Sequence, residues 1–68
     1  MRFTIDTERE EDGRWLAEIS DLAGVMAYGA TEKEAIDRAV ALGYRVLAER
    51  VEHGEMSAAM TISFQPAA

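Results

Sequence analysis

DLAGVMAYGATEKEA, residues 21–35, joins a turn and a short strand to the start of a helix. Within this stretch, Thr31 and Glu34 have the spacing of a capping box. The threonine hydroxyl is expected to accept a hydrogen bond from the Glu34 N–H, and the glutamate carboxylate to accept one from the Thr31 N–H. We therefore expect a helix to begin at Thr31, and the other elements can be placed relative to that start.

Two glycines flank the residues that precede this helix. Gly24 and Gly29 enclose Val25–Tyr28, a run with strand character. Each glycine can adopt the positive φ that a sharp turn requires. The polar segment Ser20–Gly24 predicts a longer turn before the strand. We therefore expect a turn, a third strand and a second turn to lead directly into the helix.

Two alternating segments come before this stretch. Apolar and polar residues alternate over residues 2–8, and the alternation resumes over residues 15–19. Asp12 and Gly13 lie between the two segments and are typical of a tight hairpin, in which the glycine takes the left-handed conformation. The first three strands are therefore expected to form an antiparallel meander.

Apolar residues recur at helical spacing from Thr31 to about His53. Gly43 within this helix costs up to about 1 kcal/mol relative to alanine, which indicates a close approach to the sheet. Gly54 predicts the end of the helix. His53 then lies at the C-terminal end, where the helix dipole stabilises a positive charge. The sequence therefore predicts one long helix between the third strand and the remainder of the chain.

A fourth strand is predicted over residues 60–64, where apolar and polar residues alternate, and Pro66 is expected to end it. Because the helix runs back across the sheet, this strand should lie parallel to the first, beside it. The expected fold is α+β, in the order β-β-β-α-β, with a four-stranded mixed sheet ordered 3-2-1-4. One helix covers one face of that sheet and leaves the other open.

Composition limits the function classes. The 68 residues carry a formal net charge of −6, which argues against direct binding to a nucleic-acid backbone and favours a basic partner. A domain of this size buries little core, so a homo-oligomer, a dimer or tetramer, is expected. There is no cysteine for a disulfide or thiolate zinc site. No run of about 20 apolar residues predicts a membrane span, and we expect a cytoplasmic protein.

The helix-free face of the sheet is the candidate interface for a partner or for a second copy. Self-association is expected through this face around Leu16 and Tyr28, or through the edge of the third or fourth strand. The acidic residues near the first hairpin form either a solvated tip or a surface that steers a basic partner. The candidate interface residues are Leu16, Met26, Tyr28, Glu8, Glu10 and Glu11.

The order of an Asp-Gly hairpin, a D-L-x-G turn and a G-x-T-x-x-E-A helix start resembles the HicB-like antitoxin family. The resemblance covers about residues 2–51. Ser20, Ala23 and Val25 replace the prolines and the cysteine that are usual in the family around the second turn, and Ala30 replaces a polar residue. The matching positions are Asp12, Gly13, Asp21, Leu22, Gly24, Gly29, Thr31, Glu34 and Ala35.

This resemblance implies a partial ribonuclease H-like fold and a function as an antitoxin. Such a protein binds and covers a small basic ribonuclease, a HicA-type mRNA interferase with a double-stranded-RNA-binding-like fold. Full antitoxins of this family carry a C-terminal DNA-binding segment, whereas this chain ends soon after the fourth strand. We therefore expect residues 1–68 to be a single module that does not bind DNA by itself.

Two other functions remain open. The first is a stand-alone oligomeric protein of the same fold, acting as a scaffold or binding a small ligand. The second is a metal-dependent nuclease with Asp6 and Glu34 as ligands, but the capping box already explains Glu34, and the fourth strand offers no third carboxylate. We interpret His53 as a helix-end cation and expect no catalytic residue, metal or cofactor.

Overall fold

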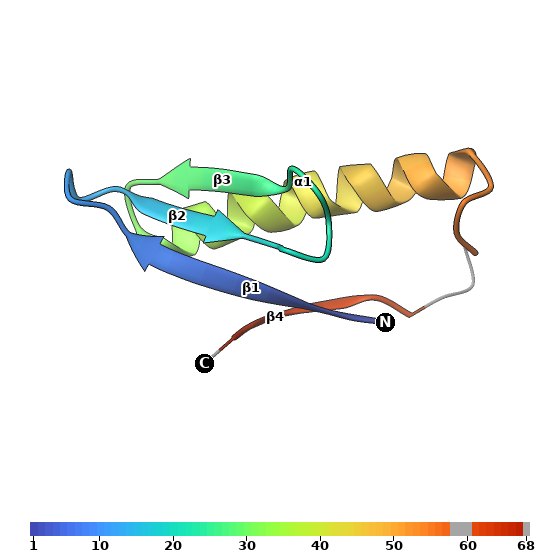
Figure 1. The fold of residues 1–68 in the computed structure, drawn as a ribbon, viewed down its shortest axis with the longest axis horizontal. Helices are drawn as coiled ribbons and strands as arrows, with labels where there is room; N and C mark the ends of the chain where they lie inside the picture. Colours follow the sequence, from blue (N-terminus) through green and yellow to red (C-terminus); the bar gives the residue numbers. More distant parts are fainter. Residues whose placement is uncertain (58–60, 68) are drawn as a thin grey trace.

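The computed structural model describes residues 1–57 and 61–67. Its strands form one sheet, and the helix lies along one face of it (Figure 1). The expected α+β fold and the order β-β-β-α-β are confirmed. The elements are β1 (Arg2–Arg9), β2 (Trp15–Glu18), β3 (Met26–Gly29), α1 (Glu32–Glu52) and β4 (Ser63–Pro66).

The sheet has the expected order β3-β2-β1-β4 and is staggered. β1 has 8 residues, and β2 and β4 have 4 each. β4 pairs in parallel with residues 2–5 of β1, whereas β2 pairs antiparallel with residues 6–9. β3 then pairs antiparallel with β2. Each half of β1 is therefore paired on a different side.

The capping residues define both ends of α1. Thr31 is the N-cap, and its hydroxyl accepts a hydrogen bond from the Glu34 N–H at 3.1 Å. The expected reciprocal bond is displaced by one residue, because the Glu34 carboxylate accepts from the N–H of Ala30 at 3.3 Å rather than from that of Thr31. At the other end, Gly54 has a φ of 72° and donates to Val51 O at 3.1 Å, as expected of a helix stop.

The core lies between α1 and the helix-facing side of the sheet. Small residues, Ala35, Ala39 and Gly43, occupy the buried centre of the helix, which lets it lie close to the sheet. A Cβ at Gly43 would lie 3.0 Å from the Phe64 ring, so the close approach predicted for this glycine is confirmed. The buried apolar residues are Phe3, Ile5, Ala17, Ile19, Leu22, Val25, Ala35, Ala39 and Leu47.

Three details of the turns and strands differ from expectation. Leu22, expected only as part of the second turn, is 1% exposed and belongs to the core. Val25 is buried but lies before β3, which begins one residue later than expected. Trp15, which the alternation over residues 15–19 places on the apolar side of the strand with Ala17, is only half-buried, because it opens β2 next to the exposed hairpin. The core therefore takes more of its volume from the second turn than alternation predicts.

Gly29 is needed for a reason other than the expected positive φ. Positive φ is found at Gly13, Gly24 and Gly54, but not at Gly29. A Cβ at Gly29 would lie 2.5 Å from the backbone nitrogen of Ala35. The first turn of α1 packs directly on the end of β3, and only glycine leaves room for it.

β4 is shorter than expected and includes the proline. It covers Ser63–Pro66, so the proline is its last residue, whereas Met60 lies outside the described residues. Phe64 stacks on Phe3 at a centroid distance of 5.4 Å and meets Tyr44 edge-on at 4.9 Å. These ring contacts join β4 to both β1 and α1. Within the described ranges, no helix combines the length and apolar character needed to cross a membrane.

Candidate interaction surface

Among the described residues, no helix or strand covers the sheet face opposite α1 (Figure 1). Cross-strand neighbours project to the same face of a sheet. The register pairs β1 with β2 and β2 with β3 so that one set of alternating residues lies on this side. This surface, called the open face below, comprises Asp6, Glu8, Leu16, Glu18, Met26 and Tyr28.

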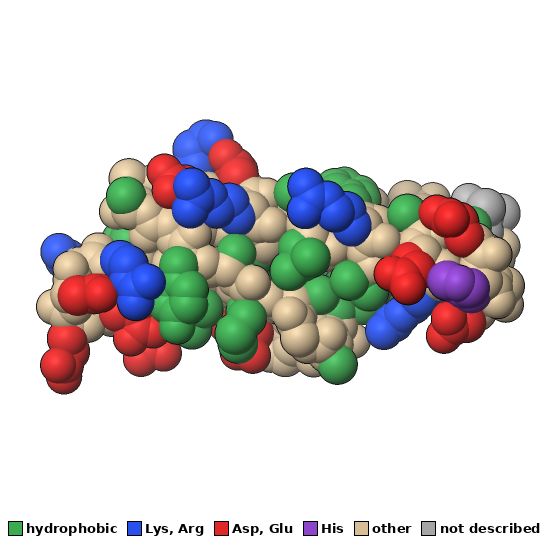
Figure 2. All heavy atoms as spheres, turned by 90° about the horizontal axis from the view of Figure 1, so that it is seen from above, with side chains coloured by type: hydrophobic (Ala, Val, Ile, Leu, Met, Phe, Trp, Pro, Cys, Tyr) green, Lys and Arg blue, Asp and Glu red, His purple; other side chains and the backbone are tan. Residues whose placement is uncertain are grey.

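The apolar part of the open face is formed by β2 and β3. Met26 is 44% exposed and Tyr28 is 41% exposed, while Leu16 between them is half-buried. Carboxylates lie beside these side chains, since Glu8 is the register partner of Leu16 and Glu18 that of Met26. In the view of Figure 2, hydrophobic side chains lie next to acidic ones, and acidic side chains are present at both ends of the molecule. The structure thus brings together the residues predicted for the interface.

The hairpin between β1 and β2 extends the acidic surface. Gly13 has a φ of 90°, as the Asp-Gly pair predicts. Asp12 accepts hydrogen bonds from the backbone N–H of Arg14 at 3.1 Å and from its Nε at 2.8 Å. The backbone bond is the main cause, followed by the side-chain bond, of a pKa of Asp12 below its ordinary value. Both contacts favour the ionised form of this carboxylate.

Arg14 links the hairpin to the open face. Its guanidinium lies 4.5 Å from the centroid of the Tyr28 ring, within the range of a cation–π contact. Residues 8–12, Arg14 and Tyr28 line a shallow hollow of about 490 Å³. Glu10 and Glu11 therefore lie beside the aromatic end of the open face. Arg14 was not predicted as an interface residue, although its even position, in phase with Leu16, indicates the same face.

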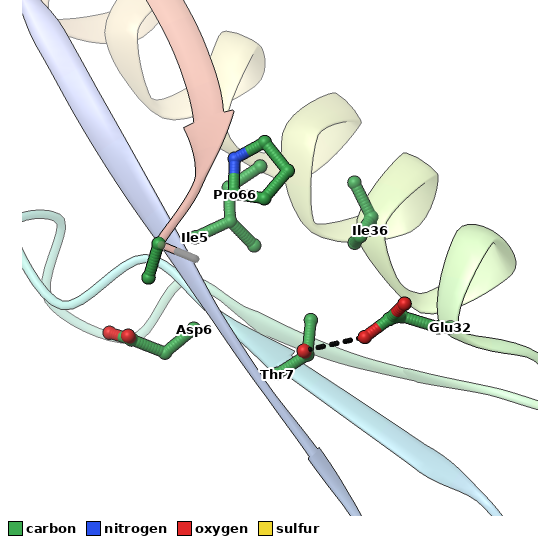
Figure 3. A pocket seen from close by; sticks show the side chains of 7 residues that line it. Ile5, Asp6, Thr7, Glu32, Ile36 and Pro66 are labelled. Atoms are coloured by element: carbon green, nitrogen blue, oxygen red, sulfur yellow. Dashed lines mark hydrogen bonds between the residues drawn. The ribbon is translucent and has the colours of Figure 1, made fainter.

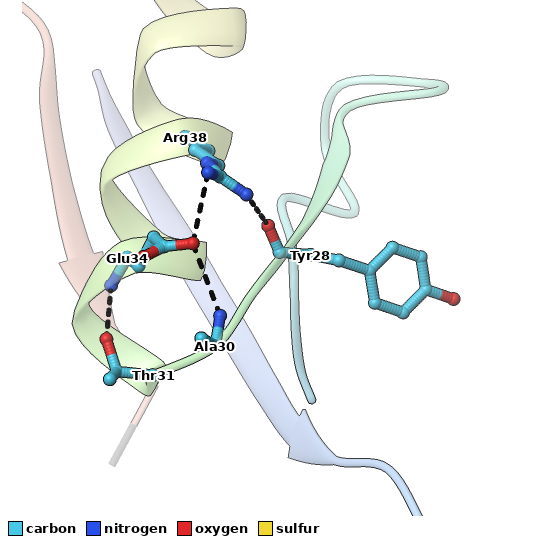
Figure 4. Close-up of polar contacts among 5 residues, drawn as sticks. All are labelled: Tyr28, Ala30, Thr31, Glu34 and Arg38. Carbon is cyan, nitrogen blue, oxygen red and sulfur yellow. Dashed lines mark hydrogen bonds and ion pairs between the residues drawn. The ribbon is translucent and has the colours of Figure 1, made fainter. Parts of the chain in front are cut away.

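The edge of β3 is occupied by a side chain from α1. Ile19 N–H donates to Val25 O at 3.0 Å, so odd-numbered residues of β3 bond to β2 and even-numbered ones face outward. Arg38 Nη1 donates to the outward Tyr28 carbonyl at 2.9 Å, while its Nη2 lies 3.0 Å from Glu34 Oε1 (Figure 4). This interaction, which the sequence analysis did not predict, protects the edge from pairing with another strand.

The two carboxylates considered for a nuclease site do not face one another. Asp6 projects away from α1, as Figure 3 shows. Glu34 is engaged by the N–H of Ala30 and by Arg38. Within residues 1–57 and 61–67, no group of three His, Cys, Asp or Glu side chains is placed to hold a metal ion. The geometry therefore gives a two-metal mechanism no support.

His53 and the second turn have structural roles. His53 caps α1, and its Nδ1 lies 2.8 Å from the Glu49 carbonyl oxygen. In the second turn Asp21 is exposed, whereas Leu22 N–H donates to Ile19 O at 3.0 Å. These residues position the strands and the helix, and they lie outside the open face.

No protein-family model matches the chain, and neither a curated protein nor a solved structure matches it. The resemblance to HicB-like antitoxins therefore depends on the turn and capping residues alone. The open face and the net charge of −6 are the features of the chain that bear on its function.

Proposed function

We propose that this chain is an antitoxin-type interaction module of the HicB-like class, which binds and neutralises a small basic ribonuclease of the HicA type. The observation that carries the proposal is the composition of the open face. Exposed Met26 and Tyr28 lie beside half-buried Leu16, and the carboxylates of Glu8 and Glu18 flank them. We assign the activity to the cytoplasm, where such a toxin would meet its mRNA.

The chemistry of this face suits a basic protein surface. Aromatic residues and methionine are enriched at the centres of protein interfaces, where they supply most of the buried apolar area. Carboxylates around such a centre attract a positively charged partner and accelerate its association. With a net charge of −6, the chain repels a second copy of itself and attracts a basic protein. The open face therefore favours a basic partner over self-association.

Neutralisation of this kind requires no catalytic group. A ribonuclease is inhibited when a tightly bound protein covers the surface on which it binds RNA. The carboxylates of the open face would then occupy the position that RNA phosphates otherwise take. We assign no catalytic, metal-binding or cofactor role to any residue of the chain.

The test starts with a tagged chain expressed in its native cells and recovered under mild conditions. Co-purification of a small, strongly basic protein in near-stoichiometric amount is the expected result. That protein should cleave RNA when purified alone and lose this activity when one equivalent of the chain is added. Recovery of the chain without a basic protein, or of a basic protein whose RNA cleavage is unaffected, would contradict the proposal.

Two tyrosines provide a matched pair of variants. Tyr28 is on the open face and Tyr44 is on α1, and both are substantially exposed, by 41% and 53%. Tyr28→Ala should weaken binding of the recovered partner by about tenfold or more, the effect typical of an interface aromatic. Tyr44→Ala removes the edge contact with Phe64 but should leave affinity unchanged. Equal losses in the two variants would place the interface elsewhere.

The second candidate function is a stand-alone homo-oligomer, a dimer or tetramer, that acts as a scaffold or binds a small ligand. The exposure of Met26 and Tyr28 on one face is the observation in its favour, because such a patch is buried when two copies pair. Sedimentation at high micromolar concentration separates the two functions. An oligomer that Tyr28→Ala dissociates, with no basic protein recovered from cells, would favour this candidate.

A further inference from the structure

The second half of β1 has an unpaired edge on the side of β4. Glu10 N–H donates to Arg14 O at 2.8 Å, so even-numbered residues in this half direct their backbone groups toward β2. Thr7 and Arg9 consequently direct theirs to the opposite side. There the ladder with β4 ends at the pair Ile5–Pro66 and the bond from Ala67 N–H to Ile5 O at 3.0 Å.

Among the described residues, no backbone partner is found on that side for Thr7 or Arg9. The edge formed by residues 7–9, beyond the end of β4, is called the notch below. It leaves two N–H and two carbonyl groups available in one row, which is the pattern that an added strand recognises.

A groove separates this part of β1 from the start of α1. It has a volume of about 510 Å³, and two of its lining residues are joined by the hydrogen bond that the Thr7 hydroxyl donates to Glu32 Oε2 at 2.8 Å (Figure 3). The helix lies over β2 and β3 and leaves the β1 side uncovered at this end. Its lining residues are Ile5, Asp6, Thr7, Glu32, Ile36, Pro66 and Ala67.

The other outer edges of the sheet carry blocking groups. The outward carbonyl of Tyr28 on β3 is bonded to Arg38. On β4, Ser63 and Ala67 donate to β1, so residue 66 faces outward, and as a proline it has no N–H to offer. Edge strands are commonly protected by such devices against pairing with other chains. The notch has neither of these two devices.

We propose that the notch binds an extended segment of a basic protein as an added strand beside β1, with apolar and basic residues alternating along that segment. Its apolar side chains would enter the groove against Ile36 and Pro66. Its basic side chains would project to the opposite side, next to Asp6 and Glu8 of the open face. The identity of that protein as the toxin rests on the proposed function, whereas the binding mode does not.

Charge complementarity selects this occupant. Asp6 and Glu8 lie on the open-face side of β1, the side to which the basic side chains would project. Arg9, the cationic residue nearest to them on β1, is exposed at the end of the strand. Lysine or arginine at alternate positions of the added strand would therefore lie opposite carboxylates, as cross-strand pairs of opposite charge do. An acidic or fully apolar strand would not gain these contacts.

The first test uses a synthetic probe, the heptapeptide Lys-Val-Lys-Val-Lys-Val-Lys with both termini capped, titrated into the isotope-labelled chain. Binding should slow amide exchange at Thr7 and Arg9 and shift their NMR signals. Two control peptides are a glutamate analogue and a peptide of the same composition with the lysines and valines in separate blocks. If the block peptide gives the same response, or the shifts centre on the acidic hairpin, the attraction is nonspecific and the proposal is overturned.

A matched pair of variants tests the main-chain bond itself. Thr7→Pro and Thr7→Val both lose the bond to Glu32, but only proline removes the outward N–H. The proline variant should bind the alternating peptide roughly tenfold more weakly than the valine variant, the scale of one lost hydrogen bond. Equal affinities overturn the proposal. If Thr7→Pro does not fold, the comparison of Arg9→Pro with Arg9→Ala replaces it. In either case, amide exchange at Thr7 of the unmodified chain, measured with and without the alternating peptide, also tests the proposal.

The same variants separate this proposal from the proposed function. If Thr7→Pro neutralises the recovered basic protein as well as Thr7→Val does, the antitoxin function stands and the notch is not its binding mode. If no basic protein is recovered, the function fails while the peptide titration still decides on the notch. If the unmodified chain is an oligomer that only Thr7→Pro dissociates, the occupant is a second copy, and the proposal of a basic partner is wrong.

Discussion

Glycine at position 29 is required by space rather than by backbone conformation. Its φ is not positive, and a Cβ there would lie 2.5 Å from Ala35 N and 2.9 Å from the carbonyl carbon of Glu34. Backbone atoms at the start of a capped helix have little freedom to move away. At Gly43, by contrast, the nearest atoms belong to the Phe64 ring, at 3.0 Å, and to the Ile19 side chain, at 3.3 Å.

We therefore expect the two glycines to respond differently to alanine. Gly29→Ala should lower the free energy of unfolding by about 2–3 kcal/mol, because it forces α1 away from β3. Gly43→Ala should change it by no more than about 1 kcal/mol, because the helix propensity of alanine offsets the displacement of a side chain. Urea unfolding of both variants measures the difference. A Gly29→Ala variant as stable as the unmodified chain would show that β3 and α1 are less tightly packed than described.

The hairpin aspartate gives a pH dependence whose sign follows from its contacts. Hydrogen bonds from Arg14 hold the pKa of Asp12 below its ordinary value of 3.8 in the folded chain. The carboxylate therefore contributes stability that is present above pH 3.8 and is lost as the pH falls through the lowered folded value.

Asp12→Asn should remove this contribution. Thermal unfolding of the variant and of the unmodified chain should then differ most at neutral pH, and the difference should shrink below about pH 3.8. The effect will be small because the side chain is exposed and screened by solvent. A difference between the two melting temperatures that is constant from pH 2 to pH 7 would mean that the contacts with Arg14 do not favour the ionised form.

At the scale of elements, the stagger of the sheet makes neighbouring residues of one strand behave differently. Ile5 pairs with β4 and Glu8 with β2, whereas the amides of Thr7 and Arg9 face the notch. Amide hydrogen exchange followed by NMR should be at least about tenfold faster at Thr7 and Arg9 than at Ile5 and Glu8, because unpaired amides exchange without any opening. Uniform protection along β1 would mean that another segment already covers the notch.

Local patterns were sufficient to predict the elements but not the contacts between their edges. Alternation, the Asp-Gly hairpin and the Thr31–Glu34 cap are short-range signals, and they located β1, β2, β3 and α1 to within a residue or two, whereas β4 begins three residues later than alternation predicted. The shift of the reciprocal cap to Ala30 and the bond from Arg38 to the Tyr28 carbonyl depend on how α1 leaves β3. Tertiary packing decides such geometry, so no window of sequence contains it.

In the candidate site, too, some features follow from local sequence patterns and others depend on tertiary packing. Strand parity placed Met26 and Tyr28 on the same side of β3, because side chains alternate with a period of two, and the register of β2 with β3 adds Leu16 to that face. The notch depends instead on how far β4 extends along β1, which is a relation between the two ends of the chain. Its existence could not be predicted from alternation in either strand.

At the scale of the whole molecule, charge and shape act together. The chain measures 40 × 21 × 16 Å, so charges at its two ends are far apart compared with the Debye length of about 8 Å at physiological salt. Glu8 and Glu18 lie on the open face, whereas Glu49 and Glu52 lie at the opposite end, in the last turn of α1. Two pairs of substitutions can therefore change the net charge equally while changing different surfaces.

Replacing two glutamates by lysines raises the net charge by four, from −6 to −2, in either pair. If the open face steers a basic partner, Glu8→Lys with Glu18→Lys should slow its association by about tenfold or more at low salt. Glu49→Lys with Glu52→Lys should slow it by no more than a few-fold, because those charges are screened from the interface. Stopped-flow association with the recovered basic protein measures both rates. Equal slowing would show that the partner responds to the net charge alone, and the open face would then lose its role in recognition.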